Sequence, residues 1–220
     1  GYALDVRDPV AFRDVVERIG RELAPVDILV NNAGIMSLGG FLDQDAALDE
    51  RQIDVNLRGP IHGLRAVLPG MLARGRGHVV NVASVAGVAG IPNAAVYSAT
   101  KYAVVGLTEA LHAEYLDSAV DLAFSAVLPS IVATELTAGT RRLRYPPPAT
   151  AEDVAAGVVY ALQTGKVEVY VPRFGRLARV LPALLPRRVV ERVGRFFGVD
   201  QVFAGIDAQA RAAYQARIRD

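Results

Sequence analysis

The sequence of 220 residues contains no cysteine, few histidines and no excess of either charge. The lack of cysteine excludes disulfides, thiolate nucleophiles and thiolate metal sites, and it is compatible with the reducing cytoplasm in which we expect the protein to reside. The three histidines are scattered without ligand spacing, so we expect no metal site: His62, His78 and His112. A net charge of +1, without a basic patch interleaved with aromatics, argues against nucleic-acid binding.

Long apolar runs are also missing. None approaches the roughly 20 residues that a membrane-spanning helix needs, and the given residues contain no secretory signal. Hydrophobic residues nevertheless make up 52% of the chain, and no linker divides it, so we expect one domain with a large core.

Apolar patterns of strand and helix type alternate along the chain. We expect strands at 2–6, 27–31, 79–83, 121–128 and 167–171, and helices at 10–23, 46–74, 96–116 and 151–163. The last of these helices should begin after Thr150 as N-cap, with Asp153 at its third position. Continuous apolar strands that alternate with helices favour a parallel sheet covered by helices on both faces, with right-handed crossovers.

Tyr97 and Lys101 stand four residues apart in a predicted helix, which places their side chains on one face, one turn apart. A cation beside a phenol favours the phenolate, so we expect the pKa of Tyr97 to fall from its usual value of about 10 toward neutrality. Such a pair would exchange protons with a substrate. The same spacing is also common in solvated pairs on helix surfaces.

Two predicted strands end in residues that suit a ligand site. Ser84 ends the apolar run 77–83, and the segment Asn-Asn-Ala-Gly at 31–34 follows the apolar run 26–30. Parallel α/β sheets place their ligand sites beyond the carboxyl ends of the strands, and small residues permit close approach of the backbone. Ser84 could also simply end its strand, which is a common role of serine.

In their order and spacing, these motifs resemble the short-chain dehydrogenase/reductase family. The resemblance runs from Leu4 to about Val171 and rests on segment 31–34, Asn56, Ser84, Tyr97 with Lys101, and Pro-Ser-Ile-Val-Ala-Thr at 129–134. It implies a Rossmann-like three-layer α/β domain over 1–172, followed by a C-terminal helical extension over 173–220 that acts as a substrate lid. It also implies hydride transfer between NAD or NADP and a carbonyl or secondary alcohol.

The resemblance implies roles for four catalytic residues: Asn56, Ser84, Tyr97 and Lys101. Ser84 and Tyr97 would polarise a carbonyl oxygen, and Tyr97 would deliver the proton. Lys101 would also bind the ribose hydroxyls of the cofactor, and Asn56 would hold a water that links Lys101 to solvent.

A cofactor site is implied in the same way. The Asp5 carboxylate would accept from the adenine amino group, the backbone N–H of Val6 would contact the ring, and Asn31 would brace neighbouring strands. The full implied set is Asp5, Val6, Asn32, Ala33, Gly34, Tyr97, Lys101, Pro129, Ile131, Val132 and Thr134. Ser130 stands where the family commonly has glycine, which raises a question about the local backbone geometry.

One family motif is missing from the sequence, namely the opening strand with its glycine-rich phosphate-binding turn. The first residues instead resemble the family's third strand. We expect the numbering to begin inside a longer polypeptide, and natural truncation is the alternative.

The C-terminal region is rich in arginine and apolar residues. Residues 173–199 carry seven arginines against one acid, Glu191, interleaved with leucine, valine and phenylalanine. Such helices could lie on an anionic membrane surface; alternatively they cover the substrate pocket or pack in an oligomer. If they line the site, a large apolar substrate is favoured, such as a lipid-like, steroid-like or retinoid-like alcohol or ketone. The loop 135–148 is expected to act as a mobile lid, although ordinary loop composition explains it equally well.

The sequence also bears on assembly and on alternative functions of the protein. The resemblance implies a homodimer or homotetramer formed through the helices around Asn56 and Tyr97, which carry apolar residues such as Val104 and Val105. A non-catalytic dinucleotide-binding sensor or scaffold is the alternative function. A serine hydrolase fits poorly, because Ser84 lies in Val-Ala-Ser-Val-Ala and not in a nucleophile elbow.

Overall fold

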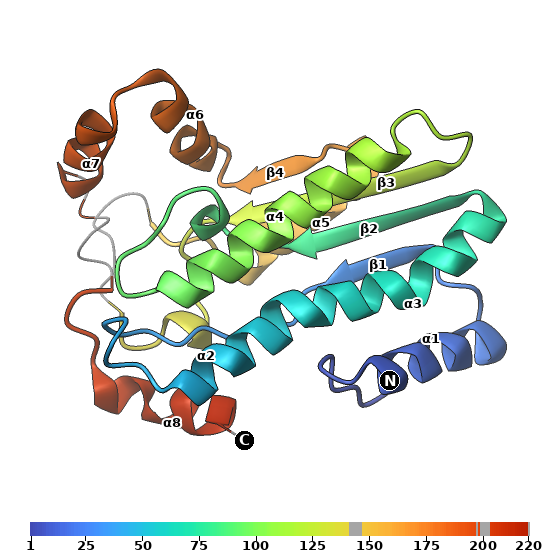
Figure 1. The fold of residues 1–220 in the computed structure, drawn as a ribbon, viewed down its shortest axis with the longest axis horizontal. Coiled ribbons are helices and arrows are strands. Elements are labelled where there is room, and N and C mark those ends of the chain that lie inside the picture. The colour runs from blue at the N-terminus through green and yellow to red at the C-terminus, as the bar shows by residue number, and fades with distance from the viewer. Residues whose placement is uncertain (141–146, 197, 199–202, 220) are drawn as a thin grey trace.

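A four-stranded parallel sheet forms the centre of the molecule (Figure 1). The computed structural model describes residues 1–140, 147–196, 198 and 203–219. Its strands are β1 (Ile28–Asn31), β2 (Arg76–Val82), β3 (Asp121–Pro129) and β4 (Glu168–Val171), and they lie side by side in chain order. Every neighbouring pair is parallel, so the carboxyl ends of all four strands meet at one edge.

Helices cover both faces of this sheet. α3 (Gly59–Arg74) and α4 (Ala95–Tyr115) pack on one face, and α5 (Ala151–Thr164) packs on the other (Figure 1). Successive strand residues point to opposite faces, and the adjacent residues Val79 and Val80 accordingly belong to two different core clusters. The predicted three-layer, Rossmann-like α/β fold is confirmed.

The predicted strand at 2–6 is wrong. This segment leads into a turn in which Asp5 O accepts from Asp8 N at 3.1 Å, just before α1 (Pro9–Glu22). A strand needs a hydrogen-bonded neighbour, and β1, which forms one edge of the described sheet, pairs only with β2. Apolar pattern alone therefore misassigned a segment whose β-structure would depend on a partner strand.

The long helical region predicted for 46–74 is continuous but changes its winding in the middle. α2 (Ala46–Ile53) runs into a π-helical turn (Asp54–Arg58), and α3 follows directly. Asn56 lies within the π-helical turn and is 1% exposed. Such turns inside α-helices are frequent at functional sites.

Two other details of the helices bear on the predictions. Thr150 and Asp153 form the predicted capping box at the start of α5, which confirms that helix start. Val104 and Val105, by contrast, are buried in a core cluster of the chain itself, so they form no free face for an oligomer. The predicted oligomer loses that support.

The C-terminal helices divide into two groups. α6 (Leu177–Leu184) and α7 (Arg187–Phe196) contain no buried residue and project from the end of the molecule beyond β4 (Figure 1). α8 (Ala208–Arg219) instead lies near α2 and buries Arg211, Tyr214 and Ile218. Among the described C-terminal residues, those that pack near Tyr97 therefore come from 203–214. Part of the predicted lid loop, 141–146, lies outside the described residues, as do 197 and 199.

Candidate active site

Ser84 and Tyr97 meet at the carboxyl edge of the sheet. Ser84 follows β2, and its Oγ accepts from Ala86 N at 3.1 Å at the start of a short 3-10 helix (Val85–Gly87). The chain then turns back, and Tyr97 lies in the first turn of α4. Ser84 is close enough to Tyr97 to influence its pKa, in the lowering direction. Two hydroxyl groups from different elements thus converge, as the motifs predict.

The pKa of Tyr97 departs from the prediction. Tyr97 is 8% exposed, and its burial raises the pKa to about 12, although the nearby Ser84 acts in the lowering direction. Burial disfavours the charged phenolate because it removes the solvent that would stabilise it. The predicted lowering of the pKa by the lysine is wrong for this structure, since desolvation outweighs any help from the ammonium.

Lys101 lies next to Tyr97 and is 5% exposed. Its Nζ donates to Val82 O at 2.9 Å and stands 5.7 Å from the centroid of the Tyr97 ring. Burial lowers the pKa of Lys101 to about 8. Gly87 permits this placement, because a Cβ there would lie 2.6 Å from Lys101 O, closer than packed atoms allow.

Asn56 holds the loop after β1 against α4. Its Nδ2 donates to Ile35 O at 2.8 Å and to Thr100 Oγ1 at 3.2 Å, while its Oδ1 accepts from Ile35 N at 2.8 Å. A Cβ placed on Gly34 would lie 3.4 Å from Asn56 Oδ1 and 3.6 Å from Lys101 Nζ. The structure therefore brings Asn56, Lys101 and Gly34 together, and the predicted water of Asn56 stays a prediction.

Further candidate residues lie after β1 and β3. Asn32 and Ala33 are exposed directly after β1, and Asn31 Nδ2 donates to Asn81 Oδ1 at 2.8 Å, which braces β1 against β2 as the resemblance implies. Pro129 is buried at the end of β3, and Thr134 is exposed a few residues further on.

The segment between Pro129 and Thr134 has its carbonyl groups engaged. Ile131 O accepts from Ala149 N at 2.8 Å, and Val132 O accepts from Thr137 Oγ1 at 2.7 Å, which leaves their N–H groups as the candidates for the predicted ligand contacts. Among the described residues other than glycine, only Asn93 has a positive φ. Ser130 therefore adopts a conformation that does not require the glycine common in the family.

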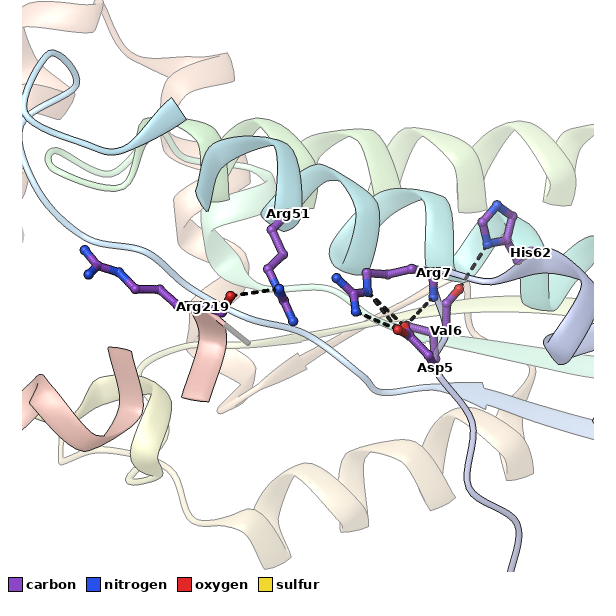
Figure 2. A network of polar contacts seen from close by, with 6 residues as sticks. All are labelled: Asp5, Val6, Arg7, Arg51, His62 and Arg219. Atoms are coloured by element: carbon purple, nitrogen blue, oxygen red, sulfur yellow. Dashed lines mark hydrogen bonds and ion pairs between the residues drawn. The ribbon is translucent and has the colours of Figure 1, made fainter. Parts of the chain in front are cut away.

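Asp5 and Val6 take part in a different network, shown in Figure 2. The Asp5 carboxylate accepts from Arg7 Nε, Nη2 and backbone N, and these bonds lower its pKa to about 2. Val6 O lies 3.0 Å from His62 Nδ1 on α3. The Asp5 side chain is half exposed but already paired, so an adenine contact would have to share it with Arg7.

Sequence reasoning missed the residues of the C-terminal region that surround Tyr97. Tyr97 packs in an apolar cluster with Met36, Leu38 and Phe203, and Tyr214 Oη accepts from Met36 N at 2.9 Å. Arg211, Tyr214 and Ile218 follow helical spacing, which is the one signal that could have indicated a buried face of α8. Arginine side chains are mostly exposed in proteins, however, so the presence of an arginine on that face argues against its burial.

Two hollows of the surface lie away from this cluster. One, of about 500 Å³, lies between α6 and the start of β4 and is lined by Glu109, Glu168, Arg179 and Val180 among others. The other, of about 1030 Å³, runs along α5 and β4. Neither is lined by Ser84, Tyr97 or Lys101, so the convergence of these side chains lies outside both hollows.

Comparisons with known proteins agree with the motifs. The family model for short chain dehydrogenases matches residues 1–144. The oxidoreductase UcpA of Escherichia coli K12 is 38% identical over 143 residues, which cover 64% of this chain and 54% of UcpA. Retinol dehydrogenase 10-A of Danio rerio is 30% identical over 217 residues, which cover 96% of this chain and 64% of that protein.

Solved structures resemble the fold. A short chain dehydrogenase from Burkholderia cenocepacia J2315, crystallised in complex with NADP, has a TM-score of 0.73 at 23% identity, with 90% of this chain and 80% of that chain covered. The chain spans little more than half the length of UcpA and about two thirds of the retinol dehydrogenase.

Proposed function

Because the chain belongs to the short-chain dehydrogenase/reductase family, we propose that it is an oxidoreductase that transfers a hydride between NAD or NADP and a carbonyl or secondary alcohol. One observation carries this proposal: the side chains of Ser84 and Tyr97 converge at the carboxyl edge of the sheet, with Lys101 Nζ 5.7 Å from the centroid of the Tyr97 ring. A non-catalytic dinucleotide-binding protein would not require that arrangement.

The residues around this edge are compatible with a dinucleotide. Asn32, Ala33 and Thr134 are exposed at the ends of β1 and β3, and Gly34 presents no side chain toward Lys101 and Asn56. We assign Asn32, Ala33, Gly34, Pro129, Ile131, Val132 and Thr134, with Tyr97 and Lys101, to cofactor binding, and we assign Asp5 and Val6 to the adenine end. When bound, the nicotinamide would supply or accept the hydride.

The protein residues then bind the oxygen atom of the substrate and exchange a proton with it. In the reduction direction, Ser84 Oγ and Tyr97 Oη donate hydrogen bonds to the carbonyl oxygen, and Tyr97 transfers its proton as the alcohol forms. A pKa of about 12 keeps Tyr97 protonated at neutral pH, which suits this role as an acid. The ammonium of Lys101 stabilises the charge that remains on Tyr97, and we assign Asn56 to the water that returns the proton.

Tyr97→Phe tests the assignment, because it removes only the hydroxyl. We expect turnover to fall about 100-fold or more, as for loss of a general acid, while dinucleotide binding is retained. The assay follows the absorbance of the reduced nicotinamide with a panel of apolar alcohols and ketones. Tyr102→Phe is the matched control, since Tyr102 is exposed on the same helix. Near-normal turnover in Tyr97→Phe would refute the mechanism, and dinucleotide binding without any turnover in the wild type would favour a sensor or scaffold.

The surroundings of Tyr97 favour an apolar substrate. Met36, Leu38 and Phe203 pack against it, and the partly buried Ile131 and Leu136 pack against the same cluster. A retinol dehydrogenase among the relatives is compatible with a lipid-like alcohol or ketone. We expect kcat/KM to rise with the apolar area of the substrate, and equal kcat/KM for small polar and large apolar substrates would contradict this.

We also propose that the α6–α7 hairpin contacts an anionic membrane surface. No helix in the described part of the chain is long and apolar enough to cross a membrane. The hairpin nevertheless exposes apolar side chains beside its arginines, with Leu177 52%, Leu184 73% and Val189 43% exposed. Basic helices with an exposed apolar face bind at the lipid headgroup level.

Flotation with vesicles tests the membrane contact. The wild type should float with vesicles that contain phosphatidylserine at low salt, and less at high salt. Arg188→Glu with Arg192→Glu should abolish flotation, whereas Arg13→Glu with Arg21→Glu on α1 is the matched charge control. Failure of the wild type to float would overturn the proposal. A concentration-dependent mass in sedimentation would then support the alternative, a homodimer or homotetramer that covers the hairpin.

The division of the chain follows from these assignments. We propose a dehydrogenase domain over 1–172 and a C-terminal extension over 173–220, of which 203–219 contributes to the substrate pocket and 173–196 to the outer surface.

A further inference from the structure

Both peptide groups of Met36 are held by α8. Tyr214 Oη accepts a hydrogen bond from Met36 N at 2.9 Å, and Arg211 Nη2 donates to Met36 O. Met36 follows β1, in the segment that leads away from the proposed cofactor residues. A single helix from the far end of the sequence therefore fixes the backbone at this position.

Arg211 also reaches the segment that follows β3. Its Nη1 donates to Leu136 O at 2.8 Å and to Ala138 O at 3.0 Å. A neighbouring bond, from Asp207 N to Gly139 O at 2.9 Å, fastens the same segment to the start of α8. One guanidinium thus connects two loops that leave different strands, because its donors point in fixed directions within one plane.

The burial of this guanidinium is unusual for an arginine. Arg211 is 0% exposed, its Nε has no hydrogen-bond partner among the described residues, and its guanidinium lies 4.7 Å from the centroid of the Tyr214 ring. Its hydrogen bonds within the described chain go to carbonyl groups. Burial of a cation without a carboxylate is costly, and an apolar side chain could fill the same volume without that cost. The arginine is therefore better explained by the three carbonyl groups that it positions than by packing.

These carbonyl groups belong to the wall beside Tyr97. Met36 lies in the apolar cluster of Tyr97, and Leu136 packs against that cluster. Tyr214 is also close enough to Tyr97 to influence its pKa, in the raising direction. A displacement of either loop would change the space available next to the Tyr97 hydroxyl.

We propose that Arg211 and Tyr214 are positioning residues that set the width of the substrate pocket by tying the loop after β1 to the loop after β3. This inference rests on the proposed oxidoreductase function, and it assigns substrate selection to α8. Neither residue touches the reacting atoms in this proposal; both act through Met36 and Leu136.

Kinetics with substrates of increasing size provide the first test. In Arg211→Met and Tyr214→Phe, we expect KM for a large apolar ketone to rise. The ratio of kcat/KM between large and small ketones should change by about tenfold, because a displacement near 1 Å lowers the rate at a positioned group by that order or more. KM for the dinucleotide should stay unchanged. Arg219→Gln is the matched control, since Arg219 is exposed on the same helix and its bond to Arg51 uses the backbone carbonyl group. An unchanged ratio of kcat/KM, even with a lower melting temperature, would overturn the positioning role.

Amide hydrogen exchange provides a second test that does not depend on turnover. Tyr214→Phe removes the acceptor of Met36 N, so the Met36 amide should exchange faster in this variant, and also in Arg211→Met, but not in Arg219→Gln. Unchanged protection of Met36 would show that α8 does not fix the loop. If the wild type reduces no ketone in the panel, the proposed function fails, and the exchange result still decides whether the two loops are tied by α8.

Discussion

Asn56 and Ile35 exchange two hydrogen bonds, one in each direction. Ile35 N donates to Asn56 Oδ1 and Asn56 Nδ2 donates to Ile35 O, both at 2.8 Å. The side-chain amide thus takes the place that a neighbouring strand would have beside this backbone. It satisfies both peptide groups of Ile35 where the chain leaves β1, and through Thr100 it links them to the helix that carries Tyr97.

Asn56→Ala should therefore destabilise the fold. The change leaves the N–H and C=O of Ile35 without their partners, so we expect a loss of about 2–3 kcal/mol in the free energy of unfolding. Urea denaturation followed by circular dichroism measures this loss. Asn32→Ala, at an exposed position after β1, should change stability by less than about 0.5 kcal/mol. Equal effects of the two substitutions would contradict the role assigned to Asn56.

Two glycines of the α4 region should respond in opposite ways to alanine. At Gly87 a Cβ would lie 2.6 Å from the Lys101 carbonyl oxygen, so Gly87→Ala must push α4 away and disturb both Tyr97 and Lys101. At Gly106, inside α4, a Cβ meets no atom of the described residues within 4 Å apart from the helix's own backbone, and alanine should stabilise the helix by about 0.5–1 kcal/mol. Melting curves of both variants check this pair, and stabilisation by Gly87→Ala would contradict the close approach.

The buried Lys101 predicts how stability depends on pH. Its pKa is about 8 in the folded chain against 10.5 for the exposed side chain, so between these values the unfolded chain binds the proton and the folded chain does not. The free energy of unfolding should therefore rise as the pH increases from about 8 to about 10.5, by at most about 1.4 kcal/mol for each step of one pH unit.

The measurement compares the wild type with Lys101→Met across this pH range. The variant lacks the titrating group, so the difference in melting temperature between the two proteins should shift in favour of the wild type as the pH rises. A difference that stays constant with pH would mean that Lys101 has an ordinary pKa in the folded protein.

Asp5 should have a smaller effect on the stability of the fold, at acidic pH. Its pKa is about 2 because of the bonds from Arg7, so its contribution to stability is present above about pH 4 and is lost as the pH falls toward 2. The carboxylate is half exposed, and we expect the contribution to stay below about 1 kcal/mol. Acid titration of the wild type against Asp5→Asn measures it. Their stabilities should converge toward pH 2, and a gap that persists there would argue against this ion pair.

The sequence predicted what depends on local pattern and on motifs. The strand predicted for 121–128 is observed as β3 (Asp121–Pro129), and the cap at Thr150 is in place, because periodicity and capping are properties of short segments. The predicted strand at 2–6 failed because its structure depends on a partner strand. The pKa of Tyr97 was predicted in the wrong direction because a sequence shows the neighbouring cation but not the depth of burial.

The contribution of α8 was also beyond prediction from pattern. The helical spacing of Arg211, Tyr214 and Ile218 is the one sequence signal of a buried face, and an arginine argues against it because arginines are mostly exposed; its partners are backbone carbonyl groups, which any residue could supply. Phe203 likewise reaches Tyr97 only through the tertiary fold.

The distance along the chain between Met36 and its two partners has a consequence for synthesis. Arg211 and Tyr214 follow Met36 by 175 and 178 residues, so these bonds close one of the longest loops in the molecule. Synthesis proceeds from the N-terminus, so the residues of the sheet are added to the chain before those of α8. A chain that stops before Arg211 would therefore lack both bonds to Met36, and the loop after β1 would not be fastened beside Tyr97.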